Sequence, residues 1–124
     1  MLLQDFYKII DITSDESGIN AIIKLNPNHE VYKGHFPDQA VVPGVIQLQI
    51  VKEILENHLD KKVFMGSVPQ VKYLIPITPE EITELSISIN YKNNEEGNIK
   101  TSVLVSFGDA VFTKAKITFS EDKQ

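Results

Sequence analysis

The sequence predicts an α+β fold in which one antiparallel sheet of about five to six strands curves around a single long, buried helix. Most of the chain consists of short segments in which apolar and polar residues alternate, and turn residues separate these segments. This pattern is typical of antiparallel strands with one buried face. Residues 43–59 differ, because apolar side chains occur on almost every face of the helix that they would form. Such a helix has to be covered by other elements.

Length and composition indicate one ordinary globular domain, residues 1–124. Of the 124 residues, 42% are hydrophobic and 23% are charged, and no internal repeat or low-complexity segment divides the chain. The net charge of −5 argues against nucleic acid as the main partner, since phosphate binding depends on clustered Lys and Arg. The absence of cysteine excludes disulfides and thiolate chemistry.

The sequence contains no pattern of a targeting or membrane segment. The stretch MLLQDFYKIIDITSDES lacks the basic start and unbroken apolar core of a signal peptide. No apolar run approaches the roughly 20 residues of a membrane span. We therefore expect no membrane span and a cytoplasmic location.

The first strands are predicted at residues 6–13 and 19–25, which are rich in isoleucine. They flank SDESG, residues 14–18, where Gly18 can take a positive φ and close a hairpin. Residues 26–39, NPNHEVYKGHFPDQ, are interpreted as a loop.

The long helix is predicted to begin at Pro43, since proline is favoured at the first helical position. Its end is predicted near Asp60 and Lys61, where the segment becomes charged. The apolar positions that indicate burial are Val45, Ile46, Leu48, Ile50, Val51, Ile54, Leu55 and Leu59.

At most four strands are predicted after the helix. Residues 63–65 and 71–74 are interpreted as two pieces of one strand, interrupted by GSVPQ. Residues 85–92, 99–107 and 111–119 alternate apolar and polar side chains, and the Gly108-Asp109 pair predicts a tight hairpin between the last two. One sheet wrapped around one central helix is the hot dog fold. A small sheet leaves an edge open, which favours an edge-to-edge dimer or a higher oligomer.

Residues 34–45, GHFPDQAVVPGV, resemble the signature of the FabA and FabZ type of 3-hydroxyacyl-acyl-carrier-protein dehydratases, which are hot dog enzymes. In that signature His-Phe-Pro precedes a hydrophobic pair and then Pro-Gly-Val at the head of the central helix. A second stretch, VKYLIPITPEE, is similar to the strand and turn that follow this helix in the family. The usual Gly-Asp of that turn is replaced by Glu80 and Glu81.

The resemblance implies a role for each motif residue. Dehydration needs a base for the C2 proton, a donor for the thioester carbonyl and an acid for the departing hydroxyl. The resemblance makes His35 the base, and it places the carbonyl donor at the NH of Gly44, where the absent side chain lets the substrate approach. Phe36, Pro43 and Val45 are expected beside Gly44 in the substrate-binding site, with the rigid Phe36-Pro37 pair holding His35.

Gln49 stands where the family has a Glu or Asp, fourteen positions after the histidine. An amide has no proton to give, and loss of a general acid typically lowers the rate about 10²- to 10⁴-fold. Two carboxylates are near in sequence. Asp38 is three residues from His35, and Glu53 shares the helix face of Gln49 and would come within reach only if the pocket extended deeper.

Three hypotheses follow. The first is a dehydratase-like lyase of acyl-chain synthesis, with His35 and Gln49 as catalytic residues and acyl carrier protein, or another acyl thioester, as partner. The second is a non-catalytic or half-catalytic subunit that binds acyl thioesters or pairs with a complete dehydratase, as homodimer or heterodimer. The third is an acyl thioesterase, for which an acidic base is equally missing.

No cofactor is expected, since nothing in the sequence resembles a nucleotide or metal site. His29, His35 and His58 lack ligand spacing, and His29 and His58 are expected to be structural or exposed. Five lysines could form a basic patch for an acidic carrier protein or be solvated strand positions: Lys33, Lys72, Lys92, Lys114 and Lys116.

Overall fold

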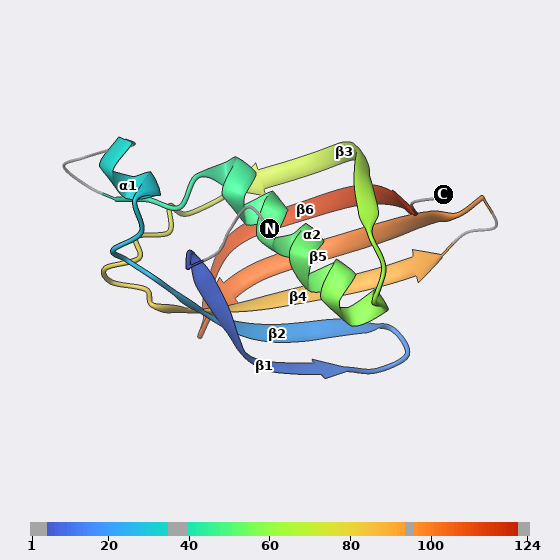
Figure 1. Ribbon diagram of the computed structural model, residues 1–124, viewed down its shortest axis with the longest axis horizontal. Helices are drawn as coiled ribbons and strands as arrows, with labels where there is room; N and C mark the ends of the chain where they lie inside the picture. Colours follow the sequence, from blue (N-terminus) through green and yellow to red (C-terminus); the bar gives the residue numbers. More distant parts are fainter. Residues whose placement is uncertain (1–4, 35–39, 94–95, 122–124) are drawn as a thin grey trace.

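The computed structural model describes residues 5–34, 40–93 and 96–121. The strands within these ranges are β1 (Tyr7–Ser14), β2 (Gly18–Leu25), β3 (Val63–Tyr73), β4 (Glu84–Asn93), β5 (Asn98–Phe107) and β6 (Ala110–Glu121). The helices are α1 (Val31–Gly34) and α2 (Gly44–Leu59). All neighbouring strands are antiparallel and form one sheet in the order β1-β2-β4-β5-β6-β3, with α2 lying across one face (Figure 1). The predicted α+β architecture is confirmed.

The core lies between α2 and the inward face of the sheet. In β4 from Leu85 to Ile89 and in β5 from Ile99 to Val105 every second side chain is buried, as the alternation of the sequence predicts. The helix contributes Ile50, Ile54 and Leu55, each at most 1% exposed. The largest fully buried strand residues are Ile23, Leu25, Leu85, Ile87, Ile89, Ile99 and Phe119.

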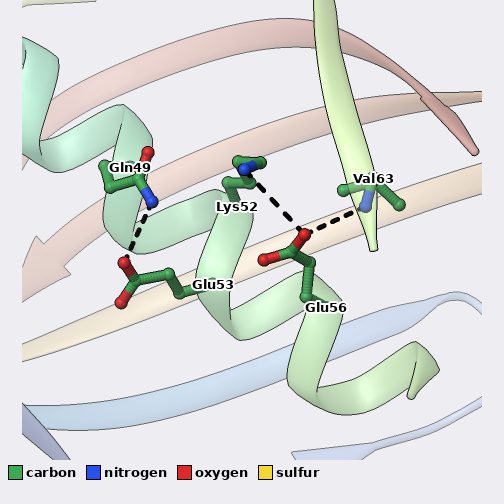
Figure 2. Close-up of polar contacts among 5 residues, drawn as sticks. All are labelled: Gln49, Lys52, Glu53, Glu56 and Val63. Atoms are coloured by element: carbon green, nitrogen blue, oxygen red, sulfur yellow. Dashed lines mark hydrogen bonds and ion pairs between the residues drawn. The ribbon is translucent and has the colours of Figure 1, made fainter. Parts of the chain in front are cut away.

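Helix α2 differs from the prediction by one residue at its start. Pro43 is the N-cap, with φ −60° and ψ 146°, and Gly44 is the first helical residue. An extended ψ fits the residue that leads into a helix rather than one within it. At the other end Asp60 adopts a left-handed conformation, φ 54°, and caps the helix as predicted. The carboxylate of Glu56 accepts the backbone NH of Val63 at 3.0 Å, which fastens this end to β3 (Figure 2).

The turn before β2 forms differently from the prediction. Gly18 does not have a positive φ, because the side chain of Asp15 builds the turn by accepting the backbone NH groups of Ser17 at 2.8 Å and Gly18 at 3.1 Å. Gly18 is required for another reason: a Cβ there would clash with the carbonyl oxygen of Ile89 on β4.

The segment predicted as a loop contains the short helix α1. The backbone NH of Val31 donates to Nδ1 of His29 at 3.1 Å, and Tyr32 is buried beside the ring of Phe6, with ring centroids 5.6 Å apart. Among the described residues the buried hydroxyl of Tyr32 has no hydrogen-bond partner. Local apolar packing therefore orders one turn of helix here.

Strand β3 is one strand rather than two pieces. The predicted interruption lies inside it as register shifts between Met65 and Ser67 and between Ser67 and Gln70, opposite β6. Gly66 and Pro69 stand in this irregular part, and proline is tolerated in edge strands. Strands β3 and β1 are the two edges of the sheet (Figure 1). Neither helix of the described ranges has the length and apolar content that a membrane crossing requires.

The contact of Gly18 with β4 predicts a destabilising effect of Gly18→Ala. The added methyl group meets rigid backbone, so the free energy of unfolding should fall by about 1–3 kcal/mol, the usual cost of overpacking. Gly66→Ala is the control, because its Cβ would lie 3.3 Å from the carbonyl oxygen of Thr118 and needs only a small shift. Urea unfolding of both variants measures the difference; equal losses would contradict the steric role of Gly18.

Candidate functional site

The candidate site is described from the start of α2. Of the predicted site residues, His35 and Phe36 lie outside the described residues, as do Pro37 and Asp38. Pro43, Gly44, Val45 and Gln49 lie in the first turns of α2 or directly before it.

The N-terminus of α2 offers backbone NH groups without a side-chain cap. The NH groups of Ile46 and Gln47 both donate to the carbonyl of Pro43, at 3.1 and 3.2 Å. The amides of Gly44 and Val45 come earlier, where a helix supplies no partner of its own. The NH of Val42 donates to the carbonyl of Ile77 at 2.9 Å and ties the approach to the helix to the segment after β3. These free amides, with the positive end of the helix dipole, suit a carbonyl oxygen.

Tyr73, the last residue of β3, lies against Gly44. A Cβ at Gly44 would stand 2.5 Å from Cζ and 2.6 Å from the hydroxyl oxygen of Tyr73. Glycine is therefore needed here for the phenol to stand over the helix start. Burial raises the pKa of Tyr73, so its hydroxyl stays protonated and remains a hydrogen-bond donor at neutral pH. Tyr73 is the aromatic residue of the stretch VKYLIPITPEE, and its contact with Gly44 was not predicted.

Gln47 fixes the rotation of the helix start. It is only 6% exposed, and its Oε1 accepts the hydroxyl of Thr113 on β6 at 2.6 Å. Its Nε2 reaches the carbonyl of Val42 at 3.4 Å. Gln47 was not predicted as a site residue, although a polar residue within an apolar helix face was the available signal.

Gln49 contacts Glu53, one turn further along α2. The Nε2 of Gln49 donates to Oε2 of Glu53 at 3.0 Å (Figure 2). The hydroxyl of Tyr7 on β1 donates to Oε1 of the same carboxylate at 2.9 Å. Glu53 is 6% exposed. Burial raises the pKa of Tyr7, and both the hydrogen bond to Glu53 and the charge of that carboxylate raise it further. Glu53 is thus a buried carboxylate behind the residue that the resemblance places in the catalytic site.

Val45, Gln49 and Glu53 share one face of α2 at intervals of four residues. Val45 is 76% exposed, Gln49 is partly buried and Glu53 is buried. This face, which we call the Gln49 face, therefore runs from the open helix start into the interior.

The other histidines of the described ranges have structural contacts, as expected. His29 accepts the NH of Val31, and Nε2 of His58 lies 3.3 Å from the hydroxyl of Tyr91. Within residues 5–34, 40–93 and 96–121 no group of three or more His, Cys, Asp or Glu could hold a metal ion.

Four of the five lysines of the predicted patch lie on the sheet face opposite α2, whereas the side chain of Lys33 lies outside the described part of the chain. Lys72 is paired with Lys114, and Lys116 follows two residues later on the same face of β6. Lys92 on β4 is exposed opposite Lys100. A carrier protein bound to these lysines would approach the sheet from the side away from the Gln49 face.

Sequence comparison places the chain in a family. Residues 11–109 match the model of the ApeI-like family, and the description of this family is ApeI dehydratase. The chain belongs to the ApeI-like dehydratase family. The predicted kinship with FabZ-type dehydratases is confirmed, because the 3-hydroxyacyl-acyl-carrier-protein dehydratase FabZ of Pediococcus pentosaceus is 24% identical over 121 residues, which cover 92% of this chain and 80% of that enzyme.

Another FabZ enzyme is more similar in sequence over a shorter stretch. The FabZ of Wolinella succinogenes is 32% identical over 85 residues, or 58% of this chain. The match spans 56% of that enzyme, a little more than half its length.

Solved structures share the fold of this ApeI-like chain. A chain of the dehydratase heterocomplex ApeI:P from Xenorhabdus doucetiae has a TM-score of 0.74 at 22% identity, covering 92% of this chain and 97% of that one. A mutant thioesterase from Pseudomonas aeruginosa has a TM-score of 0.62 at 7% identity, covering 92% and 79%. At these identities the likeness shows the hot dog fold alone.

The contact of Tyr7 with Glu53 predicts that two tyrosine substitutions change the free energy of unfolding differently. Tyr7→Phe removes a donor from a buried carboxylate and should lower the free energy of unfolding by about 1–3 kcal/mol. Tyr32→Phe removes a buried hydroxyl that has no partner in the described part of the chain, and it should leave stability unchanged or raise it. Urea denaturation followed by circular dichroism compares them. Equal destabilisation by both would contradict a stabilising role of the Tyr7–Glu53 bond.

Proposed function

We propose that this ApeI-like protein binds 3-hydroxyacyl thioesters, carried on acyl carrier protein, at the N-terminus of α2 and dehydrates them. The observation that carries the proposal is the helix start at Pro43 and Gly44, which has no side-chain cap and lies at the end of the matching motif, with the phenol of Tyr73 beside it. Membership of the dehydratase family supports the reaction class.

In the proposed reaction His35 removes a proton from C2 of the acyl chain. Negative charge develops on the thioester oxygen, where the NH of Gly44 and the helix dipole stabilise it. The C3–O bond then breaks. Gln49 holds either the hydroxyl or a water molecule beside the hydroxyl. This water molecule supplies the proton with which the hydroxyl departs as water. The hydroxide that remains takes up the proton held by His35, which balances the step.

A second role is favoured by Gln49. A subunit without its own acid could bind the acyl chain, or lend His35 to a complete homologue that supplies the acid. The ApeI:P heterocomplex, a dehydratase assembled from different chains by its description, supports this role as well.

A second hot dog subunit is the proposed partner, and it is proposed to bind at the β3 edge of the sheet. The patch beside the helix start exposes large apolar side chains: Val45 at 76%, Tyr73 at 48%, Leu74 at 51% and Ile75 at 44%. Exposed apolar side chains next to an unpaired strand edge mark a protein interface. The partner would then close the site near Gly44.

Activity should be tested by hydration of crotonyl and longer 2-enoyl thioesters, the reverse of the proposed reaction. Wild type should hydrate them slowly, and His35→Ala should lose a further 10²- to 10⁴-fold as expected for removal of a general base. Hydrolysis to the free acid would instead indicate a thioesterase. If the protein binds thioesters without turnover, and a homologous subunit restores turnover, the partner role would be favoured. Absence of both binding and turnover would contradict the proposal.

The proposed dimer should have about twice the 14.0 kDa mass of one chain in light scattering, whether this protein pairs with itself or with a homologous subunit. Leu74→Asp places a charge in the proposed interface and should weaken the dimer at least tenfold, which corresponds to about 1.4 kcal/mol. Ile10→Asp is the matched control, since Ile10 is 50% exposed on β1 at the opposite edge. Equal weakening by both variants would contradict an interface at β3.

A further inference from the structure

Glu53 is a buried carboxylate whose hydrogen bonds come from neutral groups. Both oxygens are occupied, one by the hydroxyl of Tyr7 at 2.9 Å and the other by the amide of Gln49 at 3.0 Å. The ion pairs formed by residues of the described ranges join Lys52 with Glu56 and Lys61 with Glu121, and neither includes Glu53. Burying a carboxylate without a cation is costly, so its place behind Gln49 calls for a reason beyond packing.

The carboxylate determines which way the amide of Gln49 points. A carboxylate has only acceptors to offer, so Gln49 has to turn its NH₂ group toward Glu53. Its Oε1 then faces away from Glu53, as Figure 2 shows. Without such a partner the two ends of a glutamine amide can exchange places by rotation. Here the exchange would set Oε1 of Gln49 against Oε2 of Glu53, two acceptors in contact.

Tyr7 binds the oxygen of Glu53 that does not contact Gln49. It belongs to the edge strand β1 and lies 46 residues away in the chain, so the carboxylate is held between the helix and the sheet. Gln49, by contrast, is only partly buried and follows the exposed Val45 on the same helix face. The side of Gln49 that is not bound to Glu53 is therefore the side available to a ligand.

We propose that Glu53 is a positioning residue that presents the carbonyl oxygen of Gln49 to the acyl chain and so makes the site select 3-hydroxyacyl over 3-oxoacyl thioesters. This rests on the proposed function, because it takes Gln49 to face C3 of a bound thioester. A 3-hydroxyl group donates a hydrogen bond to Oε1. A 3-oxo group is an acceptor only, and it leaves two acceptors facing each other without a proton. Sites that pair with a substrate hydroxyl reject analogues that cannot make that bond.

Three variants separate positioning from stability. Glu53→Gln keeps the size of the side chain but offers both a donor and an acceptor, so the amide of Gln49 can turn either way. The exchange Gln49→Glu with Glu53→Gln keeps every hydrogen bond of the group, and the carboxylate at position 49 again presents only acceptors. Tyr7→Phe is the control for stability, since it removes one bond to Glu53 and leaves the contact with Gln49. The single change Gln49→Glu is avoided because it would set two carboxylates against each other.

The measurement is binding of two non-hydrolysable probes, the 3-hydroxyacyl and 3-oxoacyl amides of pantetheine, at chain lengths of four to ten carbons. Isothermal calorimetry on the assembled protein gives both dissociation constants. Wild type, the exchange variant and Tyr7→Phe should prefer the hydroxyl probe by about tenfold, the effect expected for one unpaired polar group. Glu53→Gln should bind both probes within about threefold, chiefly by gaining affinity for the 3-oxo probe.

The outcomes keep this inference apart from the proposed function. If wild type binds both probes equally, or if Glu53→Gln keeps the tenfold preference while folded, Glu53 does not position Gln49 and the inference is overturned. The proposed function would survive either result, because acyl chains still bind. If wild type binds neither probe at any chain length, alone or with a homologous subunit, the proposed function fails and this inference fails with it.

Discussion

Helix α2 buries two polar side chains, Gln47 and Glu53, against a sheet that has to supply hydrogen-bond partners for both. The hydroxyl of Thr113 on β6 donates to Gln47, and the hydroxyl of Tyr7 on β1 donates to Glu53. In the sheet order these strands stand far apart, one at an edge and the other next to the opposite edge. Hydrophobic contacts alone tolerate small rotations of a helix, whereas directed bonds at two distant strands fix its rotation and position.

The geometry of the helix start depends on that fixation. Gly44 and Tyr73 approach so closely that a small rotation of α2 would change the contact between the helix start and the phenol. Gln49 lies between the two anchored residues, so its position along and around the helix is also determined. The candidate site at the helix start is therefore positioned by hydrogen bonds that lie outside it.

Much of the fold could be predicted from the sequence, because the signals are local. Alternation with a period of two identified β4, β5 and β6, and the continuous apolar pattern identified α2 to within one residue at its start. Errors arose where tertiary contacts replaced the local rule. Gly18 is needed for its closeness to β4 and not for its φ, and the irregular part of β3 is absorbed by pairing with β6.

Less of the site could be predicted. The motif indicated Gly44 and Gln49, because their spacing is fixed along one segment of chain. Nothing in the sequence could pair Tyr7 with Glu53 or Thr113 with Gln47, since these pairs are 46 and 66 residues apart and depend on the packing of the whole sheet. Glu53 was considered as a substitute acid that a deeper pocket would bring within reach, but its burial and its bonds to Tyr7 and Gln49 could not be predicted.

The long sequence separation between Tyr7 and Glu53 also bears on how the chain folds. Until β1 docks at the edge of the sheet, a helix already packed on β4 and β5 would hold a desolvated carboxylate with one donor missing. That intermediate is disfavoured, so docking of the N-terminal strand and burial of the helix should occur together. An edge strand, which in other sheets frays first, is here coupled to a buried side chain of the central helix, and the cooperativity of unfolding extends to the edge of the sheet.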